Sequence, residues 1–174
     1  MSTARHNRIF GFEAEFSADL RCIPMAVRRK LDLAGVKLKL VHWHGLSGVE
    51  RQQLLDWPDA DAALLELRHW LLQRSCSLPQ GPARPLEPVQ QAPWQQVEAI
   101  PEPLLQSCRQ LGLVLQPQRW CELDELERFA LVKLCHPGHE HRNLPRALAE
   151  FEALADPSQT IGNNGHSGAD RPGG

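Results

Sequence analysis

Residues 23–54 read IPMAVRRKLDLAGVKLKLVHWHGLSGVERQQL, and residues 100–131 read IPEPLLQSCRQLGLVLQPQRWCELDELERFAL. Aligned without a gap at an offset of 77 residues, the two stretches are identical at nine of 32 positions, where ordinary composition gives roughly two or three. An internal duplication explains this agreement, and convergence on one local motif is the alternative. The nine identities are Ile23/Ile100, Pro24/Pro101, Gly35/Gly112, Leu38/Leu115, Trp43/Trp120, Leu46/Leu123, Glu50/Glu127, Arg51/Arg128 and Leu54/Leu131.

The shared residues predict the same order of elements in each half: a helix, a tight turn, a short helix and a third helix. Pro24 and Pro101 suit the first turn of a helix, and apolar residues then recur at helical spacing. Gly35 and Gly112 follow, where a residue in the left-handed conformation ends the helix. Two capping boxes open the third helices. The capping pairs are Ser47 with Glu50 and Asp124 with Glu127.

Two further helices and an N-terminal arm complete the predicted core, so the expected fold class is all-α. Asp59 or Asp61 can cap a helix that runs to about Arg74, and Asn143 can cap the last helix. The aromatic residues of the arm need a groove to fill. The apolar positions are Ala60, Leu64, Leu67 and Leu71 in the first helix, Leu144, Ala147, Leu148, Phe151 and Leu154 in the last, and Phe10, Phe12 and Phe16 in the arm.

We expect one helical domain over residues 9–155, between disordered ends at 1–8 and 156–174. The first end is polar and the second is rich in Gly and Asn, so neither can bury enough apolar surface to order itself. Five prolines exclude a regular helix from the connector at 75–93. The expected parts of the domain are a first half at about 20–57, a helix at about 59–74, the extended connector, a second half at about 97–135 and a last helix at about 143–155.

Composition and charge restrict the class of protein. The chain has 174 residues and a net charge of −2, which argues against a dedicated binder of polyanions. No apolar run is long enough for a membrane span, and no apolar core follows the charged N-terminus as in a signal peptide. The five cysteines include no C-x-x-C pair, which favours reduced, buried thiols. We therefore expect a cytoplasmic protein.

Three strings of residues carry a family resemblance. They are FGFEAEFSADLRCIPMAVRRKLDLAGVKLKL at 10–40, LERFALVKLCHPGHEHRNL at 126–144 and ALAEF at 147–151, of which RCIPM and PGHE are the most specific. Together they resemble the nitrate reductase associated protein family of cyanobacteria. The resemblance implies a cytoplasmic protein that acts near the molybdenum-dependent, ferredoxin-linked nitrate reductase, and it transfers no catalytic residue. His136 and His141 stand where we expect an Arg and an Asn in the family.

The most asymmetric feature of the repeat is charge. Residues 21–43 contain six cations against the single acid Asp32, and the second half lacks this bias. We expect the first half to form a basic face that docks an acidic protein, while an ordinary solvated helix face is the alternative. The turn that holds His139 and Glu140 is a second candidate contact. The six cations are Arg21, Arg28, Arg29, Lys30, Lys37 and Lys39.

The expected function is that of a non-catalytic accessory protein, without cofactor or metal, that docks to nitrate reductase or to a protein of its assembly pathway. Two alternatives stay open. A helix, a turn and a helix with basic residues could form a nucleic-acid-binding regulator, although the acidic second half disfavours it. The segment from Cys135 to His141 offers a thiol, three imidazoles and a carboxylate as metal ligands, but Pro137 and Gly138 favour a simple helix-ending turn there.

Overall fold

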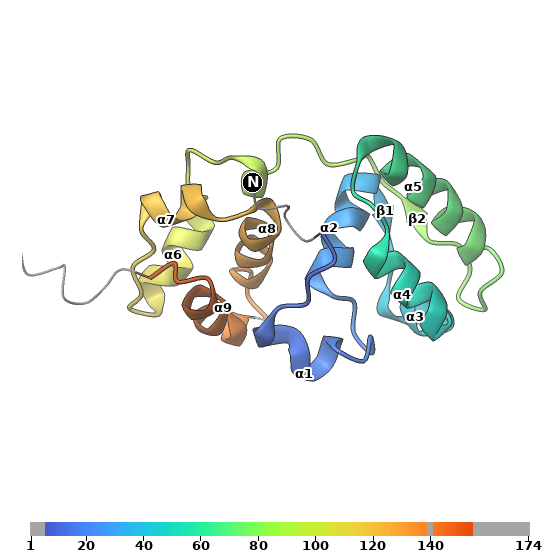
Figure 1. Ribbon diagram of the computed structural model, residues 1–174, viewed down its shortest axis with the longest axis horizontal. Helices are drawn as coiled ribbons and strands as arrows, with labels where there is room; N and C mark the ends of the chain where they lie inside the picture. Colours follow the sequence, from blue (N-terminus) through green and yellow to red (C-terminus); the bar gives the residue numbers. More distant parts are fainter. Residues whose placement is uncertain (1–5, 139–140, 155–174) are drawn as a thin grey trace, which may run out of the picture.

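The computed structural model describes residues 6–138 and 141–154. Helices dominate it, which confirms the all-α fold class, and two strands of two residues each form a small antiparallel sheet (Figure 1). The helical elements in chain order are η1 (Gly11–Glu13), α1 (Ala14–Ser17), α2 (Met25–Ala34), α3 (Leu40–Gly45), α4 (Gly48–Asp56), α5 (Asp61–Ser75), η2 (Pro93–Gln95), α6 (Glu102–Gln110), α7 (Pro117–Glu122), α8 (Glu125–Leu134), η3 (His141–Asn143) and α9 (Leu144–Glu150). The strands are β1 (Val36–Lys37) and β2 (Arg84–Pro85).

The two halves lie side by side. Helices α3, α4 and α5 gather on one side of the molecule and α6, α7 and α9 on the other, while α2 and α8 pack against each other between them (Figure 1). One buried core runs through both groups. No helix in the described ranges combines the length and apolar character that crossing a membrane requires.

Helix boundaries repeat at the offset of the sequence match. The helices α2, α3 and α4 begin at residues 25, 40 and 48, and α6, α7 and α8 begin at 102, 117 and 125. Gly35 and Gly112 both adopt the left-handed conformation, with φ angles of 70° and 66°. Burial differs in places, because Leu111 is 38% exposed where its counterpart Ala34 is 3% exposed. The common ancestry of the halves remains a prediction.

The repeated tryptophans lie in the core. Trp43 and Trp120 are both fully buried, and each indole N–H donates to a backbone carbonyl, at Leu20 (2.7 Å) and Gln96 (3.0 Å). The repeated arginines have a related role. Arg51 donates to the carbonyls of Leu20, Trp43 and His44, and Arg128 donates to those of Trp94 and Leu123. These side chains therefore serve the fold.

Several expected caps and burials differ in detail. Pro24 and Pro101 are the N-cap residues of α2 and α6, one position before the helix. Helix α5 begins after Ala60, without a side-chain cap, so the expectation that an aspartate caps it is wrong. Asn143 occupies the N-cap of α9, but its side chain makes no capping hydrogen bond. Both predicted capping boxes are confirmed, at Ser47 and Asp124.

The proline-rich connector is held against the end of α2. Strand β2 pairs with β1, and the amide of Leu86 donates to the carbonyl of Gly35 at 2.9 Å. Arg68 reinforces this contact by donating to the carbonyls of Ala34, Gly35 and Leu86. A Cβ atom at Gly35 would lie 2.4 Å from the oxygen of Leu86. The glycine thus provides both the left-handed turn and the space for the connector.

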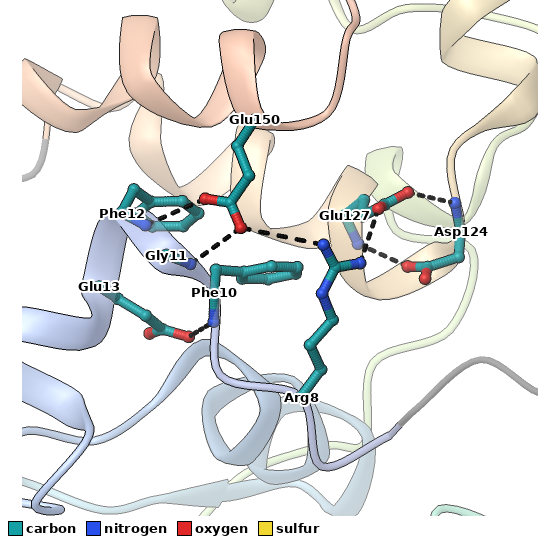
Figure 2. A network of polar contacts seen from close by, with 8 residues as sticks. All are labelled: Arg8, Phe10, Gly11, Phe12, Glu13, Asp124, Glu127 and Glu150. Atoms are coloured by element: carbon teal, nitrogen blue, oxygen red, sulfur yellow. Dashed lines mark hydrogen bonds and ion pairs between the residues drawn. The ribbon is translucent and has the colours of Figure 1, made fainter.

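Figure 2 shows how the N-terminal arm is anchored. The Arg8 guanidinium lies 2.9 Å from Glu127 Oε1 and 3.8 Å from Glu150 Oε1. The Glu150 carboxylate in turn accepts the amides of Gly11 (2.8 Å) and Phe12 (3.0 Å). Arg8 therefore makes specific contacts within the segment that we expected to be disordered. Residues 1–5 and the whole expected C-terminal tail lie outside the described residues.

Two aromatic rings of the arm are buried in the core, as the sequence predicts. Phe10 and Phe12 are 0% and 2% exposed. Their rings stack on each other with centroids 5.4 Å apart, and both contact Phe151, just after α9. Polar and apolar contacts therefore both hold the arm in place, and the arm can form one wall of a cavity.

Candidate docking cavity

A cavity of about 350 Å³ lies between the arm, α2, α3, the end of α8 and η3. Its walls are mainly apolar: Phe12 and Phe16 belong to the arm, Met25 to α2, Leu40 to α3 and Leu134 to α8. This volume is at the lower end of the range for pockets that take drug-sized ligands, and it can hold one or two side chains of a partner protein.

Residues of the RCIPM string and residues that follow the PGHE string meet at this cavity. Cys22, Ile23 and Met25 come from the RCIPM string, and Arg142 and Asn143 follow the PGHE string at a distance of a few residues. The strings are more than a hundred residues apart in sequence, and the packing of α2 against α8 brings them together. The geometry therefore concentrates at one place the residues that carry the resemblance.

Glu13 is the acid of the cavity, and it is used internally. It is 1% exposed, and its two carboxylate oxygens accept the amides of Phe10 (3.1 Å) and Met25 (3.0 Å). Burial raises the pKa of this carboxyl to about 7, and the two backbone hydrogen bonds and nearby Arg28 oppose the rise. Glu13 thus joins the arm to the first residue of α2 and presents little charge to the opening.

Arg28 and Arg142 give the cavity its positive charge. Arg28 is half-buried on α2, with its Nη1 3.9 Å from the sulfur of Met25, and Arg142 is exposed in η3. On the far wall Leu40 is 46% exposed, next to Val41 at 49%. The opening therefore combines the exposed cation of Arg142 with an apolar shoulder, an arrangement suited to an acidic segment that also carries an apolar side chain.

The structure corrects the expected basic face at two of its six cations. Arg29 is 8% and Lys30 is 0% exposed, so neither can belong to an exposed face. Arg29 binds Glu125 and Asp59 instead. The charge pattern of residues 21–43 grouped both residues with the exposed cations, but α2 is covered by α4, α5 and α8. This burial also removes two cations from any surface that could face nucleic-acid phosphates.

Lys30 caps a neighbouring helix. Its Nζ donates to the carbonyl oxygens of Leu54 (3.4 Å) and Leu55 (2.5 Å), in the last turn of α4. A cation is favourable there because the carbonyls at a helix C-terminus lack partners and carry partial negative charge. Burial lowers the pKa of this ammonium to about 8, and the carboxylate of Asp59 opposes the change.

The other expected contact residues are divided between separate places. Arg21 is exposed and pairs with Asp19 at 2.6 Å in the loop before α2. Lys37 and Lys39 are exposed and line a second hollow, beside the sheet. His139 and Glu140 lie outside the described residues.

Sequence reasoning missed the roles of Glu13 and Arg142. An acidic residue in an aromatic-rich arm is an ordinary surface pattern, and only the packing of the arm buries it. The helix-ending HPG turn made nearby residues candidate contacts, but nothing in the sequence indicated that Arg142 lies at a cavity. No group of three or more His, Cys, Asp or Glu side chains suited to a metal gathers in the described ranges, which omit two residues of the Cys135–His141 segment.

Comparison with known proteins places the chain in one family. Curated proteins and solved structures gave no match. A family model described as conserved nitrate reductase-associated protein matches residues 9–151. That range contains every residue named above as lining the cavity, together with most of the arm. The chain therefore belongs to the conserved nitrate reductase-associated protein family.

Proposed function

We propose that this protein is a non-catalytic, cytoplasmic accessory protein that docks to nitrate reductase through the cavity. The family name links the chain to that enzyme. The observation that carries the docking role is the cavity itself, because an apolar pocket with the exposed Arg142 beside it suits an acidic segment with a protruding apolar side chain. The proposed occupant is such a segment of the reductase.

The walls of the cavity favour binding over chemistry. Its carboxylate, Glu13, is already committed to two backbone amides, and the remaining side chains are mostly apolar. The pocket is also held in shape before a partner arrives. Arg8 and Glu150 fix the arm, so the partner meets a preorganised surface and little chain has to be ordered on binding.

The proposal predicts how affinity depends on charge. Arg142→Glu reverses an exposed cation at the opening without touching a core contact, so we expect at least tenfold weaker binding to purified nitrate reductase. Binding of the unaltered protein should weaken as salt rises, since complementary charge is screened. Arg119→Glu is the matched control, because Arg119 is exposed on α7, at one end of the molecule (Figure 1), and pairs with Glu122 of its own helix.

Biolayer interferometry with immobilised reductase measures both variants. Equal dissociation constants for Arg142→Glu and the unaltered protein would contradict the proposal that the cavity is the docking site. If the unaltered protein binds a protein of the assembly pathway and not the reductase, the choice of partner is overturned, and the comparison of Arg142→Glu with the unaltered protein then tests the cavity against that protein.

A further inference from the structure

We propose that a second hollow, beside the two-stranded sheet, binds a small oxyanion. The hollow has a volume of about 260 Å³, and three cations, a histidine and an amide line it: Lys37, Lys39, Arg84, His42 and Gln80. Its volume lies just below the range of pockets that take drug-sized ligands, and its lining is mostly cationic, which favours a small anion. The inference is independent of the docking cavity.

Strand pairing brings the cations together. Lys37 on β1 lies directly opposite Arg84 on β2, and like charges at opposed positions destabilise a strand pair. Lys39, two residues after Lys37, is also extended, with φ and ψ of −81° and 158°, and it lines the same hollow. Residues two apart on an extended chain face the same side, so Lys39 joins Lys37 there.

These three cations lack partners of opposite charge. Within the ranges 6–138 and 141–154, neither Lys37 nor Lys39 nor Arg84 forms an ion pair or a side-chain hydrogen bond. Other exposed cations of the chain, such as Arg21 and Arg119, have a carboxylate neighbour. An anion in the hollow would replace mutual repulsion by attraction for all three groups at once.

His42 adds a donor that has no acceptor. The residue is 3% exposed, and its Nδ1 accepts the backbone amide of Lys39 at 3.1 Å. In the neutral ring the proton is therefore on Nε2, and Nε2 has no hydrogen-bond partner among the described residues. A buried donor without an acceptor is unfavourable, and an oxyanion provides acceptor oxygens.

The hollow is built on fixed backbone. Ser75 Oγ accepts the amide of Ala83 at 2.8 Å, which holds the turn that carries Gln80 and leads into β2. The same turn packs closely on the end of α3, because a Cβ atom at Gly45 would lie 3.1 Å from the side chain of Leu78 and 3.3 Å from that of Gln80. Little chain has to be ordered when the ion binds.

The test is a titration of the full chain with inorganic phosphate and, separately, with nitrate. Isothermal calorimetry at constant ionic strength in chloride should show saturable binding of one ion per chain, and the same ion should raise the melting temperature. If phosphate binds more tightly, the hollow is a site for a tetrahedral anion. If nitrate binds more tightly, it is a site for a planar monoanion. If neither ion binds or raises the melting temperature, the proposal is overturned.

Two variants separate a built site from general charge. Arg84→Gln should weaken binding at least tenfold, and Arg119→Gln should leave it unchanged. In chloride alone Arg84→Gln should melt slightly above the unaltered protein, because it removes a like-charge pair. Equal ion affinity in both variants would contradict the assignment. Arg84→Gln should still bind nitrate reductase. A wrong anion site and a wrong docking cavity therefore give different experimental results.

Discussion

Arg29 of α2 donates from Nε and Nη2 to one oxygen of Glu125, at 3.0 and 2.6 Å, across 96 residues of sequence. Its Nη1 donates to Asp59 at 2.9 Å. One side chain thus joins α2 to the first turn of α8 and to the loop between α4 and α5. Since α2 and α8 form the contact between the two groups of helices, this arginine helps to fix the geometry on which the cavity depends.

Replacing Arg29 by Ala should lower the free energy of unfolding by about 2–3 kcal/mol, because a nearly buried arginine is lost and two carboxylates are left without their partner. The loss should be smaller than for a fully buried pair, since the side chains of Glu125 and Asp59 are each 34% exposed. Urea unfolding followed by circular dichroism measures the change. Arg119→Ala should shift it by less than about 0.5 kcal/mol. Unfolding midpoints that agree for Arg29→Ala and the unaltered protein would show that the contact is not used.

Glu13 should make stability depend on pH. Its pKa is raised from an ordinary 4.5 to about 7, so the folded protein holds this proton more tightly than the unfolded chain does. The contribution of the group to the free energy of unfolding is then fully present below about 4.5 and falls as pH rises to about 7. Glu13→Gln cannot ionise and should remove this part of the slope.

Glu15→Gln is the control for Glu13, because Glu15 is exposed on the same arm and should leave the slope unchanged. Thermal unfolding between pH 4.5 and 8 measures all three proteins. A slope in Glu13→Gln equal to that of the unaltered protein would assign the pH dependence to other groups.

A comparison of Gly35 with Gly112 separates two costs of a side chain: backbone strain, which both positions share, and the clash with the connector, which occurs at Gly35. Both residues have positive φ angles, so an alanine at either should cost about 1–2 kcal/mol. At Gly35 the new Cβ also meets the carbonyl of Leu86 at 2.4 Å, whereas nothing lies within 4 Å at Gly112. We therefore expect Gly35→Ala to lower the melting temperature clearly more than Gly112→Ala. Equal losses would mean that the connector moves aside.

The repeated elements were predictable because local rules determine them. Capping boxes, helix-ending glycines and apolar periodicity act over a few residues, so Ser47, Asp124, Gly35 and Gly112 were placed correctly. The burial of Arg29 and Lys30 was not predictable in this way. It depends on which helices cover α2, and both partners of Arg29 come from other elements.

The cavity was only partly accessible from sequence. Arg28 and the region after Cys135 were candidate contacts, but their proximity follows from the packing of α2 on α8, for which the sequence offers no local signal. The pairing of Lys37 with Arg84 is similar, because a two-residue strand in a proline-rich connector has no pattern of its own. Local sequence patterns predict the helices, whereas the cavity and the hollow depend on long-range packing.

Chemical blocking of the cavity at Cys22 is the most direct test of the docking role. All five cysteines are free; Cys22 is half-buried in the cavity wall, and Cys76 and Cys121 are exposed, so the expectation of buried thiols is wrong for these two. Burial raises the thiol pKa of Cys108 and Cys135 and slows their reaction. In a Cys76→Ser, Cys121→Ser background, N-ethylmaleimide therefore fills the cavity by modifying Cys22, and the added Cys22→Ser change provides a protein that the reagent leaves open.

The deciding measurement is the dissociation constant for nitrate reductase of these two proteins after identical treatment, with the melting temperature of each recorded to show that it is folded. The docking account predicts at least tenfold weaker binding by the protein blocked at Cys22 and unchanged binding by the Cys22→Ser protein. If the blocked, folded protein binds the reductase as tightly as the untreated one, the cavity is not the docking site and the account is contradicted.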